Sequence, residues 1–277
     1  MMRQKSLGRC GFTVSEIGFG ARWTFTTGRT LAEAQAAHDT LKAVLEGGIT
    51  HIDTASSYKD SEKVLGEVLA ETGHKPVIAS KAWKGDEASI RKAVEEGLKN
   101  LHVNAIDIYI IHNPESTFAA LPVYRKLKDE GLIRAIGVTG WHGDEERMRR
   151  VIEDGTADIL QIAITMTHRG MIEKGIMGLA VKNNLGIQVM SPMAYGILTG
   201  PHAAIAPLRP YGISLLEQAA IKFIIDHVPN GVPIPGTSKP DRVRTFLSVA
   251  DMPPIPETVW QKVIHNIEQV PELMRLP

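Results

Sequence analysis

The chain has 277 residues, of which 31 are Lys or Arg and 31 are Asp or Glu. This balance leaves no net charge to attract nucleic acid or an anionic membrane, so we expect a small molecule as the partner. The single cysteine, Cys10, excludes an internal disulfide and a cysteine zinc cluster, which suits a reducing compartment. No apolar run approaches the roughly 20 residues of a membrane-spanning helix, and residues 1–12 lack the apolar centre of a signal peptide. We therefore expect a soluble, cytoplasmic protein.

Short apolar segments alternate along the chain with amphipathic segments of helical length, and Gly, Pro, Asn or Asp separates them. Strands are predicted, in chain order, over 15–21, 50–55, 76–82, 106–112, 133–140, 159–164, 186–192 and 231–237. Helices are predicted over 31–48, 61–71, 88–100, 117–131, 144–155, 171–184, 214–228 and 240–250. Left-handed helix ends are expected at Gly47, Gly131, Gly155 and Asn184.

The order of these segments predicts the fold. Strands joined by helical crossovers must run parallel, and eight such units in about 250 residues match the size of a closed (β/α)8 barrel. We predict this barrel as one domain over residues 1–277. The alternative is a doubly wound sheet, but its G-x-G-x-x-G turn is missing, because residues 18–23 read GFGARW. Outside the repeat, residues 5–16 predict a β-hairpin and residues 256–273 an extra C-terminal helix.

Polar residues stand at the ends of the predicted strands, on the face where barrels of this kind carry their active sites. They are Asp53, Lys81, His112, Thr139, Gln161, Ser191 and Thr237, with Tyr58 on the loop after Asp53. Each one alone could be a helix cap or a strand-end charge. Together they favour a functional site, because Lys81 and His112 interrupt runs that would otherwise stay apolar.

Asp53, Lys81, Tyr58 and His112 predict acid catalysis. A buried lysine ammonium needs a partner, and Asp53 on the neighbouring strand is an available carboxylate. We expect this pair to leave a lysine donor facing the Tyr58 phenol, whose pKa a cation about 4 Å away would lower from its reference value of about 10. Tyr58 could then protonate the alkoxide that forms when hydride reaches a carbonyl carbon. His112, as a neutral imidazole, could orient the carbonyl oxygen.

These residues and their surroundings resemble the aldo-keto reductase family nearly from end to end. The matching blocks are DTASSY, SEKVLGE, SKAW, IHNP, GLIRAIGVTGW, QVMSPMAYGILTG and VPIPGTSKPDRV. The resemblance implies a (β/α)8 barrel that reduces an aldehyde or ketone to an alcohol with a nicotinamide cofactor. It also implies a catalytic tetrad of Tyr58, Lys81, Asp53 and His112.

The resemblance further implies the cofactor contacts. Thr139 and Gln161 would hold the nicotinamide carboxamide, and Ser191 with the backbone of the segment MAYGILTG (193–200) would line the pyrophosphate. Near a helix N-terminus, where backbone N–H groups and the helix dipole favour anions, the adenosine phosphate would meet Thr237, Ser238, Lys239 and Arg242. The two cations favour NADPH, with NADH possible, whereas the alternative for them is a solvated surface pair.

The chain departs from the family pattern at several positions. Gly140 stands where many members carry asparagine, Met190 where an aromatic ring often stacks on nicotinamide, and Gly236 where many members carry a phosphate-binding lysine. Thr245 and Phe246 replace a Glu-Asn pair that often contacts adenine.

On the substrate side, the resemblance assigns Trp23 and Trp83 to the pocket wall. Asn113 follows His112 where some members place tryptophan, which suggests a more polar or open pocket. The role of Trp141 is left undecided.

The leading interpretation is an NADPH-dependent reductase of a small carbonyl compound. A nicotinamide-binding regulatory or interaction subunit with little turnover is a second hypothesis. A non-redox lyase or isomerase that uses Lys81 as a Schiff base is the third, although it would not need the VPIPGTSKPDR segment. No metal is predicted, because His51 and Asp53 have no third ligand at suitable spacing. The sequence carries no signal for the oligomeric state.

Overall fold

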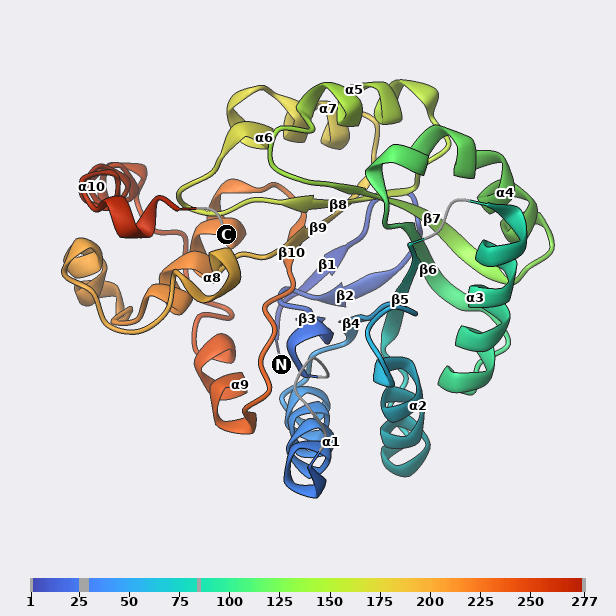
Figure 1. Ribbon diagram of the computed structural model, residues 1–277. Helices are drawn as coiled ribbons and strands as arrows, with labels where there is room; N and C mark the ends of the chain where they lie inside the picture. Colours follow the sequence, from blue (N-terminus) through green and yellow to red (C-terminus); the bar gives the residue numbers. More distant parts are fainter. Residues whose placement is uncertain (1, 25–29, 84–85, 276–277) are drawn as a thin grey trace.

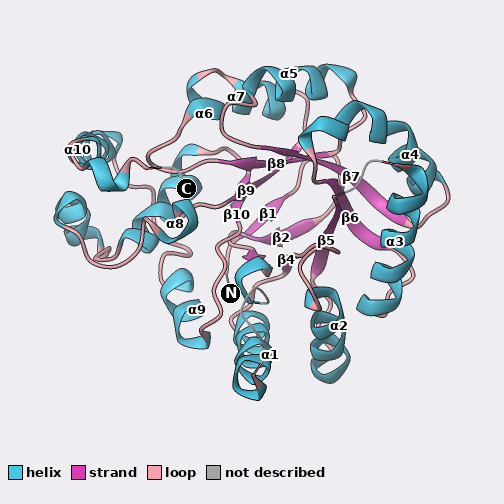
Figure 2. Cartoon of the chain, viewed as in Figure 1, coloured by secondary structure: helices cyan, strands magenta, loops and turns pink. Residues whose placement is uncertain are grey.

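The computed structural model describes residues 2–24, 30–83 and 86–275, and its strands form a parallel barrel surrounded by helices (Figures 1 and 2). The strands are β3 (Phe19–Gly20), β4 (His51–Asp53), β5 (Val77–Ala82), β6 (Ile106–Ile111), β7 (Ile133–Gly140), β8 (Ile159–Ala163), β9 (Gly186–Met190) and β10 (Gly231–Pro233). They pair in chain order from β3 to β10. Backbone N–H groups of Gly18 and Gly20 donate to the carbonyls of Pro233 and Pro235 at 2.9 and 3.0 Å, which joins the last strand to the first. The predicted (β/α)8 fold is confirmed.

The helices on the outside of the barrel follow the predicted order. They are α1 (Leu31–Glu46), α2 (Ser61–Thr72), α3 (Glu87–Leu101), α4 (Thr117–Asp129), α5 (Glu145–Asp154), α6 (Gly170–Glu173), α7 (Ile176–Lys182), α8 (Leu216–His227) and α9 (Pro240–Leu247). The single helix predicted over 171–184 is wrong. The chain breaks it into α6 and α7 at Gly175, which has a φ of 73° and so adopts a left-handed conformation that ends one helix before the next begins.

Three of the four predicted left-handed helix ends are correct. Gly131, Gly155 and Asn184 have φ values of 77°, 77° and 52°. Gly47 has a φ of −71°, so the prediction there is wrong, and the left-handed residue after α1 is Gly48 with a φ of 81°. The helix ends at Glu46, two residues before the predicted end, and the left-handed glycine stands one residue later than predicted.

An N-terminal hairpin packs against the end of the barrel where the strands begin. Its strands β1 (Gln4–Ser6) and β2 (Thr13–Ser15) pair antiparallel, as predicted. Gly8 forms an isolated bridge with Leu185, just before β9, and a Cβ on Gly8 would lie 2.4 Å from the Leu185 carbonyl carbon. Leu7 packs on apolar residues inside the barrel, including Ile108. The hairpin therefore covers one mouth of the barrel, and the predicted site lies at the other.

The C-terminal segment forms the helix α10 (Glu257–Glu268), which packs against the 3-10 segment η4 (Ala203–Tyr211). Its Trp260 is fully buried and donates from Nε1 to Asp226 Oδ2 of α8 at 3.0 Å. Among the described residues, no helix combines the length and apolar character that crossing a membrane would require.

Candidate active site

The alternation of side chains along the strands directs the predicted catalytic residues into the barrel mouth. Ala79, Ile108 and Ile159 belong to the cluster inside the barrel, whereas the apolar residues next to them belong to the cluster that includes the helix side chains. Because side chains two residues apart along a strand share a face, this alternation places Lys81 and Gln161 on the inner face. Short apolar strands that end in a polar residue thus converge at one mouth of the barrel.

Lys81 and Asp53 form a buried ion pair at that mouth. Lys81 Nζ donates to Asp53 Oδ2 at 2.6 Å and to the Thr54 carbonyl at 2.6 Å. Only 1% of Lys81 is exposed. Removing either partner would therefore leave the other as an uncompensated buried charge. The register of β4 on β5, with Asp53 opposite Ala79, brings the two side chains together.

The second oxygen of the Asp53 carboxylate is also bound. Gln161 Nε2 donates to Asp53 Oδ1 at 2.7 Å, and the Thr139 hydroxyl donates to Gln161 Oε1 at 3.3 Å. All of these side chains are buried. Side chains from β4, β5, β7 and β8 therefore form one connected network.

Tyr58 lies above this network, on the loop between β4 and α2. The Lys81 Nζ atom is 5.0 Å from the centroid of its ring. Burial raises the pKa of the Tyr58 phenol, the Lys81 charge acts in the opposite direction, and Asp53 raises it again. We expected Lys81 to lower this pKa overall, but desolvation outweighs the cation. The phenol is therefore protonated at neutral pH and has a proton to donate.

His112 follows β6 and contacts two aromatic rings edge-on. Its ring centroid lies 6.0 Å from that of Tyr58 and 4.9 Å from that of Trp83. Burial lowers the pKa of His112 to about 3, and the charges of Lys81 and Arg22 act in the same direction. The imidazole is thus neutral across the physiological range, as the sequence argument requires for a hydrogen-bonding group that orients a carbonyl.

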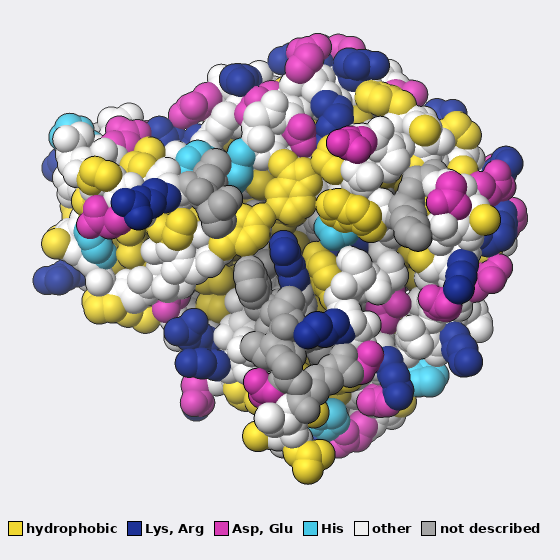
Figure 3. All heavy atoms as spheres, viewed as in Figure 1, with side chains coloured by type: hydrophobic (Ala, Val, Ile, Leu, Met, Phe, Trp, Pro, Cys, Tyr) yellow, Lys and Arg dark blue, Asp and Glu magenta, His cyan; other side chains and the backbone are white. Residues whose placement is uncertain are grey.

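A cleft of about 260 Å³ opens beside Tyr58 and runs toward α9. In the space-filling view, hydrophobic side chains gather over the centre of this face, with basic side chains among them (Figure 3). Eight predicted site residues line the cleft: Asp53, Tyr58, Gln161, Ser191, Thr237, Ser238, Lys239 and Arg242. Thr139 lies behind Gln161, and neither Lys81 nor His112 is part of the lining. The structure thus brings most of the predicted cofactor residues to one cavity.

The wall after β9 has an unusual backbone. Ser191, Ala194 and Tyr195 have φ values of 53°, 46° and 56°, although none of them is glycine. Backbone hydrogen bonds hold the turn, among them those from Ala194 N to the Ser191 carbonyl at 2.9 Å and from Leu198 N to the Met193 carbonyl at 3.1 Å. Such strained residues cluster at ligand sites, where the surrounding structure holds them in place.

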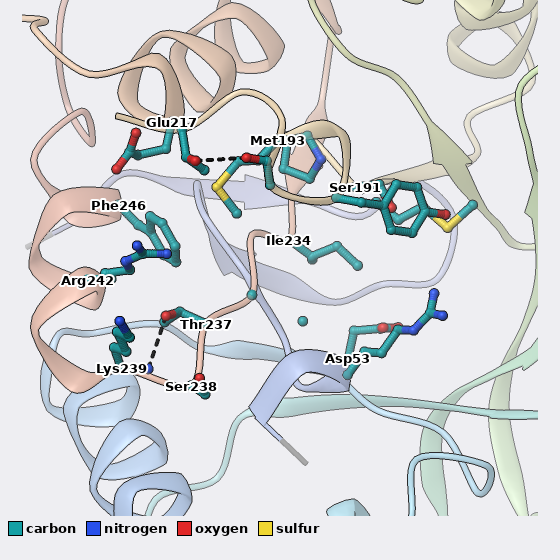
Figure 4. Close-up of a pocket in the computed structure, with 18 of the residues that line it drawn as sticks. Asp53, Ser191, Met193, Glu217, Ile234, Thr237, Ser238, Lys239, Arg242 and Phe246 are labelled. Atoms are coloured by element: carbon teal, nitrogen blue, oxygen red, sulfur yellow. Dashed lines mark hydrogen bonds between the residues drawn. The ribbon is translucent and has the colours of Figure 1, made fainter. Parts of the chain in front are cut away.

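The far end of the cleft is formed by the start of α9 (Figure 4). The Thr237 side chain is buried and its hydroxyl accepts from Lys239 N at 3.1 Å. Lys239 and Arg242 are exposed and lie on the same side of the pocket as Phe246 (Figure 4). Two cations beside a helix N-terminus give this end the chemistry to bind a phosphate.

The predicted substrate residues are less closely grouped. Trp83 is 50% exposed beside His112, and Trp141 lines the cleft. Asn113 lies outside the cleft lining, where its side chain accepts from Glu115 N at 3.1 Å and caps a 3-10 turn. The side chain of Trp23 lies outside the described part of the structure.

Met193 and Tyr195 line the cleft as part of the MAYGILTG segment that the resemblance assigned to the pyrophosphate. Several other lining residues were not found from the sequence, among them Arg22, Glu217 and Ile234. Arg22 stands in the segment GFGARW, which lacks the G-x-G-x-x-G pattern. Its guanidinium lies 5.8 Å from the Tyr195 ring centroid. Glu217 accepts from Gly200 N at 2.7 Å. Its position on the inner side of α8 depends on how the helix packs, which no local motif indicates.

Comparison with known proteins identifies the family. The profile of the Aldo/keto reductase family matches residues 16–211. The chain belongs to this family. It is 30% identical over 231 residues to the NADH-specific methylglyoxal reductase of Escherichia coli strain K12, covering 72% of this chain and 70% of that one.

Two further proteins are similar to this chain. A probable voltage-gated potassium channel subunit beta of Arabidopsis thaliana is 26% identical over 253 residues, covering 82% of this chain and 75% of that one. The solved structure of an aldo-keto reductase from Klebsiella pneumoniae in complex with NADPH has a TM-score of 0.78 at 24% identity, covering 95% of this chain and 94% of that one. The chain thus shares its fold with a protein whose structure includes NADPH.

Proposed function

We propose that this aldo/keto reductase reduces the carbonyl group of a small aldehyde or ketone to an alcohol, with NADPH as the cofactor and Tyr58 as the general acid. The observation that carries the proposal is the protonated, buried phenol of Tyr58 beside the Lys81–Asp53 pair, in the wall of a cleft. Family membership supports the reaction type, and the NADPH complex of the Klebsiella pneumoniae protein supports the cofactor.

The residues that line the cleft fit a dinucleotide. The exposed cations Lys239 and Arg242, with the start of α9, suit the phosphate of the adenosine half. The strained turn at Ser191 suits the pyrophosphate, and Gln161 suits the nicotinamide carboxamide. When bound, reduced nicotinamide would supply the hydride.

The protein's own part of the reaction is to hold and transfer a proton. Tyr58 would donate its phenolic proton to the developing alkoxide, which is more basic than the phenolate left behind. Lys81 would stabilise that phenolate, and the ion pair with Asp53 holds the Lys81 side chain in place. Neutral His112 would hydrogen-bond the carbonyl oxygen and aim it at Tyr58.

The sequence is also compatible with two other functions. A Schiff-base role for Lys81 needs a neutral, accessible amine, whereas Lys81 is buried, binds both Asp53 and the Thr54 carbonyl, and does not line the cleft. A regulatory subunit with little turnover has one observation in its favour, the similarity to a probable channel beta subunit.

The test is the loss of NADPH absorbance with a panel of small aldehydes and ketones, for the wild-type chain and Tyr58→Phe. We expect turnover by the wild type and a loss of about 10²- to 10⁴-fold in the variant, with NADPH affinity retained. NADPH binding without oxidation by any carbonyl would reject the reductase and favour the regulatory subunit.

A further inference from the structure

Gln161 reaches across the barrel mouth to Asp53. In the ring of eight strands, β4 and β8 stand four strands apart, so their ends face each other across the opening. The hydrogen bond from Gln161 Nε2 to Asp53 Oδ1 at 2.7 Å spans this opening. Both side chains are buried, and both line the cleft.

The network fixes which way the Gln161 amide points. An ionised carboxylate only accepts hydrogen bonds, so the atom that faces Asp53 must be the NH₂ group. The Gln161 oxygen then faces the Thr139 hydroxyl, which can donate. Each Asp53 oxygen consequently has one donor, Lys81 on one side and Gln161 on the other.

We propose that Gln161 is a positioning residue of the acid site, which holds the Asp53 carboxylate from the opposite side of the barrel and thereby sets where Lys81 meets Tyr58. This inference rests on the proposed function and goes beyond it, since the family resemblance assigns Gln161 only to the cofactor carboxamide. The remaining amide hydrogen of Gln161 can still face the cleft, so one side chain can serve both groups.

The reason is geometric. With Gln161 in place, the carboxylate can turn in neither direction without breaking one of its two bonds. Without that donor, both carboxylate oxygens are free to turn toward Lys81, and only the Thr54 carbonyl then fixes where the ammonium stands relative to the Tyr58 ring. A misplaced catalytic group costs rate even when binding is unchanged.

Gln161→Glu gives the sharpest test, because it replaces an amide by a carboxyl group of nearly the same shape. Two facing carboxyl groups share a proton, so the pKa of the pair is raised. In its protonated form the introduced carboxyl group can donate to Asp53 as the amide does, whereas in its ionised form it repels Asp53. The titratable or charged groups near the pair are His51, Lys81, Tyr58 and Arg22.

We expect kcat of Gln161→Glu, at saturating NADPH and carbonyl, to approach that of the wild type near about pH 5.5 and to fall about tenfold or more as the pH rises through the raised pKa. The wild type should show no such decline, because His112 stays neutral and Tyr58 stays protonated over this range. Gln161→Met, which removes the donor without adding a charge, should lose about tenfold in kcat at every pH, with the carbonyl KM changed by less than about threefold.

Gln188→Met is the matched control. Gln188 is the register partner of Gln161 on β9, is equally buried and does not line the cleft, so its variant should keep the wild-type kcat and pH profile. If both Gln161 variants keep the wild-type kcat, or fall by one common factor at every pH, Gln161 has only a structural role and the inference is overturned. A wild type that never oxidises NADPH overturns the proposed function, and the inference with it.

Discussion

The two ends of the cleft are built in different ways. At the end with Asp53, the wall is supported by strand residues whose side chains are buried and bound to one another, from Lys81 to Thr139. The other end, around Lys239 and Arg242, is made of exposed side chains at the start of a helix (Figure 4). The first end can hold a reacting group in a fixed place, and the second can attract an anion without fixing its geometry.

This difference leads to different effects of substitution. A change at the buried end should alter stability and turnover together, because each charge there depends on its partner. A change at the exposed end should alter cofactor affinity alone and should depend on salt.

The largest effect is expected from Lys81→Met. It leaves the Asp53 carboxylate buried with one donor fewer, so we expect a loss of about 3 to 5 kcal/mol in the free energy of unfolding, measured in urea. Turnover per folded molecule should fall at least about 10²-fold, because Tyr58 loses the cation that stabilises its phenolate.

Lys222→Met separates the two effects. Lys222 is buried like Lys81 and donates to Asp226 at 2.6 Å, but it lies on α8 and takes no part in the hydrogen-bond network of Asp53 and Gln161. Its loss should destabilise the fold by a similar amount and leave turnover per folded molecule unchanged. Equal losses of turnover in the two variants would show that Lys81 has no part in the chemistry.

The next effect concerns acid stability and depends on His112. Its pKa is lowered to about 3 in the folded chain, from about 6.5 when unfolded, so it contributes stability that is present above pH 6.5 and lost as the pH falls. Between pH 7 and pH 5 this loss amounts to about 2 kcal/mol, since each pKa unit is worth about 1.4 kcal/mol.

His112→Gln should remove that part of the acid sensitivity when urea unfolding is compared at the two pH values. His74→Gln, at an exposed position, serves as the control and should leave the sensitivity as it is. An unchanged pH dependence in His112→Gln would mean that the folded chain accepts a charged imidazole at the barrel mouth.

The buried end was also the more predictable from sequence. A lysine after VIAS and a histidine after IYII interrupt apolar runs. Because side chains alternate between the two faces of a strand, their positions indicate which face of the barrel wall they lie on. The bond from Gln161 to Asp53 could not be predicted, because it joins residues 108 positions apart through the curvature of the closed barrel. The pKa of Tyr58 was expected to fall and instead rises, since a sequence shows a nearby cation more readily than the extent of burial.

At the exposed end, Arg242→Ala should raise the KM for NADPH about tenfold and leave the KM for NADH nearly unchanged, because only NADPH carries the extra phosphate. The effect should shrink as salt is added, since the side chain is exposed. Arg244→Ala is the control on the same helix. Arg244 pairs with Asp241 and does not line the cleft. If Arg242→Ala changes the KM for NADPH and the KM for NADH equally, Arg242 does not bind the extra phosphate of NADPH.

The smallest effect is expected from Gly140→Ala, which tests how tightly Met148 packs against the end of β7. Gly140 ends β7 beside Thr139, and a Cβ there would lie 2.6 Å from Met148 Sδ and 2.8 Å from Met148 Cγ. Methionine is flexible, so Gly140→Ala should cost about 1 kcal/mol, at the low end for overpacking. In a Met148→Ala background the same change fills space and should stabilise the chain instead. If urea unfolding shows the same cost in both backgrounds, Met148 is not what excludes a side chain at this strand end.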